Sequence, residues 1–211
     1  RLHRALDKVS MFRTPDLLSD SNKDVLISIQ AFNYFSVSVA GQPVNWRRRK
    51  AAELFAYLLN RPERTASKYQ LCDALWPEQD GEKAQVYLQT VIYQLRQNLQ
   101  SLNRDQVLIR YFDQKYQLVL KDHHYDVEIF EHVTSNRKSL LVPRYDDLKA
   151  LVLKYGDGYL AHEDWPWIVS RQSFLAARYT RLLEFLIGRA REAGEAADVS
   201  VFSDRLRQLQ G

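Results

Sequence analysis

Four polar side chains recur at helical spacing within residues 81–100: Thr90, Tyr93, Gln94 and Gln97. On a helical wheel, at about 100° per residue, they lie opposite an apolar stripe. Their hydroxyl and amide groups suit hydrogen bonds to base edges, and a helix fits the major groove of DNA. The alternative interpretation is the solvated face of an ordinary amphipathic helix. The face is rich in Gln and aromatic residues rather than Glu/Lys pairs, which favours contact with DNA.

Cations accompany this face at three places. Lys83 lies on the same helical pattern, and Arg96 lies beside the polar face, as Gln89 does. Four consecutive cations open the first helical pattern: Arg47, Arg48, Arg49 and Lys50. A helix N-terminus attracts phosphate, and four adjacent cations repel one another unless an anion is present. They predict either a phosphate anchor, which gives affinity without sequence information, or a solvated basic cap.

The net charge of the chain is concentrated in the same region. Residues 1–45 contain 5 Lys+Arg and 4 Asp+Glu, residues 46–116 contain 12 and 8, and residues 117–211 contain 13 and 14. The net charge of the middle segment, +4, therefore equals that of the whole chain. A localised basic surplus on a compact helical segment is typical of proteins that bind a phosphate backbone.

The sequence contains no pattern that supports catalysis or metal binding. The seven glycines form no phosphate-binding loop, and no G-x-S-x-G motif occurs. Cys72 lies beside Leu71 in a short helical pattern and is interpreted as a core thiol rather than a nucleophile. The histidines at 123, 124 and 132 lack Cys partners and i, i+4 spacing, so a metal site is the weaker interpretation. The acidic pairs Asp146-Asp147 and Glu163-Asp164 are interpreted as solvated. The sequence predicts no enzyme, no metal and no cofactor.

The elements that must position these residues follow from hydrophobic periodicity. Alternating residues over 25–46 predict a small antiparallel sheet, with a third short strand at 43–46. Three helical patterns follow: one from Arg47 to Asn60, one opened by Ser67 and Gln70 as a capping box, and one with a buried stripe. The stripe residues are Leu88, Val91, Ile92, Leu95 and Leu99. Strands at 107–111 and 116–120 then predict a hairpin, and three helices followed by a hairpin is the order of a winged helix.

The hairpin would form the wing. Tyr111, Gln114 and Lys115 lie at or near its tip, where they could reach an adjacent minor groove or phosphate. The predicted fold class is an α+β winged helix, with an N-terminal sheet and a wing, followed by an all-α tetratricopeptide-like domain.

The remaining segments are helical or linking. Patterns at 125–133, 145–154 and 167–194 predict helices, and residues 156–158 contain a break. Residues 1–9 read as the end of a helix and 10–24 as a linker. Three domains are predicted. Residues 1–24 form an upstream helix end and linker, residues 25–122 form the winged helix, and residues 123–211 form the helical domain. One cysteine and no long apolar run or signal pattern lead us to expect a cytoplasmic setting without a membrane.

Residues 25–120 resemble the OmpR/PhoB-type winged-helix domain. The matching features are the N-terminal sheet, L-C-D-A-L-W-P at 71–77 and Q-T-V-I-Y-Q-L-R-Q-N-L at 89–99. The L-W-P ending and Y-D-V-E-I-F at 125–130 narrow the resemblance to antibiotic-regulatory-protein (SARP) activators. In that family the second part is a bacterial transcriptional activator domain, to which Y-G-D-G-Y-L at 155–160, a Trp at 165 or 167 and R-Y-T-R-L-L-E-F-L at 178–186 are similar.

The resemblance implies transcription activation through double-stranded promoter DNA, by a homodimer or by tandem copies on direct repeats. It implies base reading by Thr90, Tyr93, Gln94, Arg96 and Gln97. It also implies that the loop with Trp76, Glu78 and Asp80 faces the sigma or alpha subunit of RNA polymerase. Residues 1–9 are similar to the last helix of a receiver domain, as in a two-component response regulator. Many relatives have Arg in place of Gln94 and Gln97, and a glycine before Tyr116. The competing hypothesis is a protein-interaction module with the winged helix as a scaffold.

Overall fold

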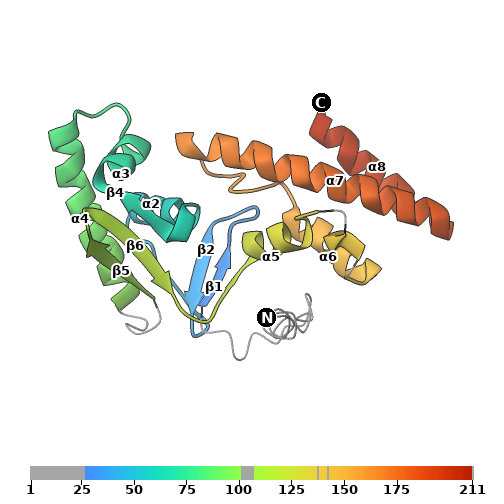
Figure 1. The fold of residues 1–211 in the computed structure, drawn as a ribbon, viewed down its shortest axis with the longest axis horizontal. Helices are drawn as coiled ribbons and strands as arrows, with labels where there is room; N and C mark the ends of the chain where they lie inside the picture. Colours follow the sequence, from blue (N-terminus) through green and yellow to red (C-terminus); the bar gives the residue numbers. More distant parts are fainter. Residues whose placement is uncertain (1–26, 101–106, 137, 142, 211) are drawn as a thin grey trace, which may run out of the picture. The chain divides into compact units, whose positions relative to one another are not determined.

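The computed structural model describes residues 27–100, 107–136, 138–141 and 143–210 (Figure 1). The helix end predicted at 1–9 and the linker at 10–24 lie outside the described residues. Contacts divide the described chain into two compact units. We call residues 27–127 with 157–173 the winged-helix unit, and residues 128–156 with 174–210 the helical unit. This confirms the predicted class, a winged helix followed by a helical region.

The N-terminal sheet has four strands in the order β3-β2-β1-β7. Its strands are β1 (Ile27–Gln30), β2 (Ser36–Val39), β3 (Gln42–Pro43) and β7 (His123–Tyr125). The antiparallel pairing of β1 with β2 is as predicted, and alternation buries Ile27, Ile29, Val37 and Val39. The third strand lies at 42–43 rather than at 43–46. Strand β7, which periodicity did not predict, pairs in parallel with β1.

Three helices follow, as predicted: α2 (Arg49–Leu59), α3 (Lys68–Leu75) and α4 (Gly81–Gln100). Ser67 caps α3, because its hydroxyl accepts from the Gln70 amide while the Gln70 side chain accepts from the Ser67 amide. The predicted stripe of α4 is buried in full, as are the apolar residues of α2. Helix α4 thus packs one apolar face inward and leaves its polar face at the surface, whereas residues 51–59 of α2 are buried on all sides.

The wing belongs to a second sheet of order β4-β6-β5. Its strands are β4 (Thr65–Ser67), β5 (Val107–Phe112) and β6 (Lys115–Leu120), and the turn η1 (Pro62–Arg64) precedes β4. The hairpin turn contains only Asp113 and Gln114, so it is tighter than the predicted four-residue connection. Both residues have positive φ, 44° and 57°. Such turns favour asparagine, aspartate or glycine at the first position and glycine at the second, so Asp113 suits its conformation and Gln114 does not.

The strained wing turn gives a first testable expectation. Gln114→Gly should raise the free energy of unfolding by about 1 kcal/mol, because glycine adopts positive φ without a Cβ clash. Gln117→Gly, in the adjacent strand, should lower it by about 0.5–1 kcal/mol. Urea denaturation of both variants would measure the two shifts. A loss of stability in Gln114→Gly would contradict the strained conformation of the turn.

The helical unit draws on five further segments of helix. They are α5 (Asp126–Val133), η2 (Ser139–Leu141), α6 (Tyr145–Tyr155), α7 (Val169–Ala193) and α8 (Ala196–Gln210). Its core contains the stacked rings of Tyr155 and Tyr179, with centroids 3.8 Å apart. Asp147, predicted as solvated, is instead buried, and its carboxylate accepts from the Arg144 amide at the start of α6. Asp147 is buried because it caps the helix, and capping holds an acidic side chain against the first turn of α6.

Residues 157–173, including η3 (Pro166–Ile168), belong to the winged-helix unit. The Asn33 amide donates to the Gly158 carbonyl at 2.8 Å, and the Leu160 amide donates to the Ala31 carbonyl at 2.7 Å. Trp165 is 4% exposed and lies in an aromatic cluster with Phe35, at 6.1 Å between ring centroids. The predicted boundary at 122–123 divides the chain linearly, whereas these contacts join two separate stretches of sequence into one unit.

Candidate nucleic-acid interface

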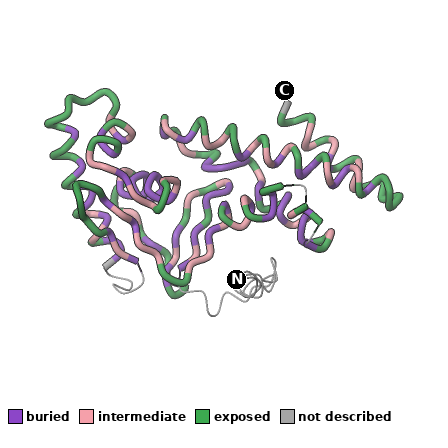
Figure 2. The backbone as a smooth tube through the Cα atoms, viewed as in Figure 1, coloured by how far each residue is buried: buried purple, intermediate pink, exposed green. Residues whose placement is uncertain are grey.

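The polar face of α4 is open in the winged-helix unit. Val86 and Tyr93 are 61% and 64% exposed, and Gln89, Thr90 and Gln97 are exposed as well. Along α4, buried and exposed positions alternate with the helical period (Figure 2). Figure 1 and the contacts between α4 and β5 place this helix beside the wing. A solvent-facing helix next to a hairpin presents two elements that can enter adjacent grooves of a duplex.

The predicted reading residues differ in their freedom to contact a ligand. Arg96 is half-buried, and its Nη2 donates to the Ile109 carbonyl of β5 at 3.2 Å. Gln94 is half-buried too, and its Oε1 is buried without a hydrogen bond from any described residue. The Thr90 hydroxyl donates to the Val86 carbonyl within the helix. Tyr93 and Gln97 are therefore the polar side chains of this face best placed for base edges.

The wing exposes the residues that the sequence singled out, Tyr111, Gln114 and Lys115. Two further residues join them. Phe112 is exposed beside Tyr111, and the Lys68 amide donates to the Gln114 carbonyl at 3.3 Å. The Lys68 ammonium lies 5.2 Å from the Tyr111 ring centroid, within range of a cation–π contact. Only the pairing of β4 with β6 brings Lys68 to the wing, so no local sequence signal marks it.

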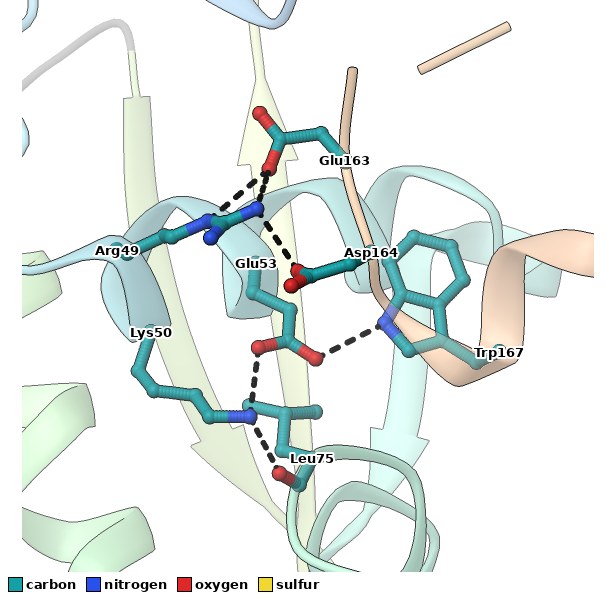
Figure 3. Close-up of polar contacts among 7 residues, drawn as sticks. All are labelled: Arg49, Lys50, Glu53, Leu75, Glu163, Asp164 and Trp167. Carbon is teal, nitrogen blue, oxygen red and sulfur yellow. Dashed lines mark hydrogen bonds and ion pairs between the residues drawn. The ribbon is translucent and has the colours of Figure 1, made fainter. Parts of the chain in front are cut away.

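The basic segment divides into two pairs of residues. Arg47 and Arg48 are exposed, and Arg48 is the N-cap residue of α2. Arg49 and Lys50 are held by other parts of the unit (Figure 3). Arg49 Nη2 lies 3.0 Å from Glu163 Oε2 and 2.8 Å from Asp164 Oδ1. The interpretation as solvated is wrong for Glu163, whose side chain is 19% exposed, whereas Asp164 is exposed as predicted and also pairs with Arg49.

Lys50, whose side chain is 41% exposed, covers a buried carboxylate. Its Nζ lies 2.8 Å from Glu53 Oε2 and donates to the Leu75 carbonyl at 2.6 Å. Glu53 is 1% exposed, and its Oε1 accepts from Trp167 Nε1 at 3.3 Å. Burial raises the pKa of the Glu53 carboxyl, while the hydrogen bond and charge of Lys50 oppose the rise. Lys50 therefore neutralises the buried Glu53 carboxylate. This role explains the position of Lys50 in the fold, and no phosphate contact is needed to explain it.

The loop between α3 and α4 carries the residues predicted to face polymerase. Glu78 and Asp80 are exposed, while Trp76 is half-buried beneath the Lys50 ammonium, 5.6 Å from its ring. Lys83, predicted as a phosphate contact, lies 3.7 Å from the Asp80 carboxylate. Since both partners are exposed, this pair is weak and open to exchange with an anion.

Other chemistry has little structural basis. Cys72 is buried, and burial raises the pKa of its thiol, as expected for a core residue. Within the described ranges, no group of three or more His, Cys, Asp or Glu side chains could hold a metal ion. A ring nitrogen of His123 lies 2.6 Å from Arg64 Nη2. Among the helices that the structure describes, none is long and apolar enough to cross a bilayer.

Comparison with known proteins gives a family match for the central segment. Residues 41–115 match the family described as transcriptional regulatory protein, C terminal. Among solved structures, Mycobacterium tuberculosis EmbR in complex with a low affinity phosphopeptide matches with a TM-score of 0.64 at 18% identity. The match covers 85% of this chain and 50% of that one, so this chain spans half the length of the EmbR structure. At this identity the likeness shows the fold alone. No curated protein sequence matches the chain.

Proposed function

We propose that this chain, whose residues 41–115 match the family described as transcriptional regulatory protein, C terminal, activates transcription by reading promoter DNA through α4 and the wing. The family match supports a DNA-binding transcriptional regulator. Together with the EmbR-like fold, it supports the resemblance to SARP-type activators. The observation that carries the reading role is the exposed face of α4 opposite its buried stripe.

The contacts divide into reading and anchoring groups. Tyr93 and Gln97 would meet base edges, and the exposed methyl groups of Val86 would meet thymine methyls in the major groove. Arg47, Arg48, Lys68 and Lys115 would contact phosphates, which orient the domain without specifying a sequence. Arg96, which donates to the wing backbone, would set the angle between helix and wing and would support reading indirectly.

A salt titration tests the DNA-binding role. The logarithm of the affinity for duplex DNA should fall linearly with the logarithm of salt concentration, by about 0.9 per phosphate contacted. Fluorescence anisotropy with a duplex enriched from a random pool, and with a scrambled duplex, would measure both slopes. An affinity independent of salt would instead favour the competing role, a protein-interaction module that uses the winged helix as a scaffold.

Single substitutions separate reading from anchoring. Gln97→Ala should weaken binding to the enriched duplex by about 5- to 100-fold and leave scrambled DNA almost unchanged, because a base contact is worth about 1–3 kcal/mol. Arg48→Ala should weaken both by the same factor, since phosphates carry no sequence information. The same anisotropy assay measures both variants. Equal losses on the two duplexes for Gln97→Ala would remove the exposed face of α4 as the reader.

The partners implied by the family resemblance fit exposed surface on the winged-helix unit. Glu78 and Asp80 would meet a basic surface of the sigma or alpha subunit of RNA polymerase. Binding as a homodimer, or as tandem copies on direct repeats, would add affinity to a reading face that has few cations. A receiver domain upstream would make the chain the output of a response regulator.

A further inference from the structure

Arg49 opens helix α2 in the middle of the chain's densest basic segment, yet two carboxylates already hold it. The guanidinium donates to Glu163 through Nε at 3.3 Å and Nη2 at 3.0 Å, and to Asp164 through Nη2 at 2.8 Å (Figure 3). Planar, multidentate contact of this kind is also how arginine binds a phosphate group. The two carboxylates therefore occupy donors that a DNA backbone would otherwise use.

The acidic pair is held in place by the fold and not by the ion pair alone. Trp165, directly after Asp164, is buried among aromatic rings, and the Trp167 indole donates to the buried Glu53. Before the pair, the Gly158 and Leu160 backbone groups bond to Asn33 and Ala31, in the connection between β1 and β2. Glu163 and Asp164 thus stay beside α2 whether or not Arg49 is engaged.

The contact with Arg49 can be exchanged. The Arg49 side chain is 59% exposed, so solvent screens the pair and its net free energy is small. A helix N-terminus with Arg47 and Arg48 next to it attracts anions at the same place. A phosphate approaching this end of α2 must displace two carboxylates from Arg49 and face their negative charge.

We propose that Glu163 and Asp164 act as a built-in competitor of the DNA backbone at Arg49, which lowers the affinity of the winged-helix unit for all duplexes alike. This inference rests on the proposed DNA-binding function. Because the competition concerns a phosphate contact, it changes affinity and salt dependence and leaves base discrimination unchanged. Arg49 contributes to DNA binding only when the acidic pair is neutralised or displaced.

The test uses the isosteric double variant Glu163→Gln/Asp164→Asn of the full chain, assayed on the enriched and scrambled duplexes. Regaining one phosphate contact should raise affinity for both about 5-fold at 0.15 M salt and steepen the salt slope by about 0.9. Arg49→Ala should cost less than 2-fold in the wild-type chain and should abolish the gain in the double variant. Unchanged tryptophan fluorescence would show that the variant keeps its fold.

A matched control separates local competition from net charge. Glu63→Gln/Asp73→Asn removes the same two charges from exposed positions of the same unit and should raise affinity less than 2-fold. A gain equal to that of Glu163→Gln/Asp164→Asn would overturn the inference, and so would an Arg49→Ala loss in the wild-type chain as large as that of Arg48→Ala. If the wild-type chain bound no DNA in a salt-dependent way, the proposed function itself would fail, so the two failures are distinguishable.

Discussion

Trp165→Ala is expected to lower the free energy of unfolding of the winged-helix unit by about 4 kcal/mol. Large-to-small substitution of a buried tryptophan loses both its transfer free energy and the packing around the cavity. Trp165 is almost fully buried and packs against Phe35 and Trp167, so neighbouring rings have little room to collapse. The loss would occur in the winged-helix unit, although Trp165 lies more than forty residues beyond the wing.

Urea denaturation followed by tryptophan fluorescence measures this effect selectively, because all four tryptophans lie in the winged-helix unit: Trp46, Trp76, Trp165 and Trp167. Tyr69→Ala is the control, since Tyr69 is exposed and its loss should cost about 0.5 kcal/mol or less. If Trp165→Ala were no more destabilising than Tyr69→Ala, residues 157–173 would not be part of this unit in solution.

The second large effect is pH-dependent. Lys50→Met should destabilise the winged-helix unit by about 3 kcal/mol at pH 8, because it leaves the Glu53 carboxylate buried without its cation. Methionine retains the apolar stem of lysine, so the change mainly removes the charge and the hydrogen bond to the Leu75 carbonyl. The loss at pH 5 should be clearly smaller.

The direction follows from proton linkage. The pKa of Glu53 is raised by burial above that of an exposed carboxyl, so the native state binds protons more readily than the unfolded chain. The stability that this provides is fully present below the unfolded pKa and is lost as pH rises through the raised pKa. Without Lys50 the pKa rises further, since the charge that opposed burial is gone, and the loss at alkaline pH grows.

Urea denaturation of Lys50→Met between pH 4 and pH 8 would show this trend. In Lys50→Met/Glu53→Gln the carboxylate is absent, so the difference from wild type should depend much less on pH. A Lys50→Met deficit of the same size at pH 5 and pH 8 would mean that Glu53 is not the group left uncompensated.

Local sequence patterns predicted the elements with strong periodicity. The apolar stripes of α2 and α4 have helical spacing over three or more turns, and the Ser67 capping box marks the start of α3. These signals are contained within one element, so the exposed polar face opposite the stripe of α4 could also be predicted. The wing turn is shorter than predicted, because Gln114 adopts a positive φ that its side chain disfavours.

Features that depend on contacts between distant segments have no local signal in the sequence. Strand β7 has three residues, too few for periodicity, and its parallel partner β1 lies almost a hundred residues earlier. A separation of 114 residues likewise hides the Arg49–Glu163 pair, since nothing in residues 163–164 shows that a guanidinium lies beside them. Arg96 looked like a free reading residue, and only the pairing of helix and wing reveals that it donates to Ile109.

The return of residues 157–173 to the winged-helix unit also sets an order of events during synthesis. A domain that ended at the wing could complete its fold as soon as Leu120 had been added. This unit cannot complete its fold until Trp165 and Trp167 have been added, about 50 residues later. At 5–20 residues per second, their synthesis takes roughly 3–10 s more. During that interval Glu53 lacks its indole partner and the Phe35 cluster lacks one of its rings. A nascent chain is therefore expected to become fully competent for DNA only after residues 128–156 have already been made.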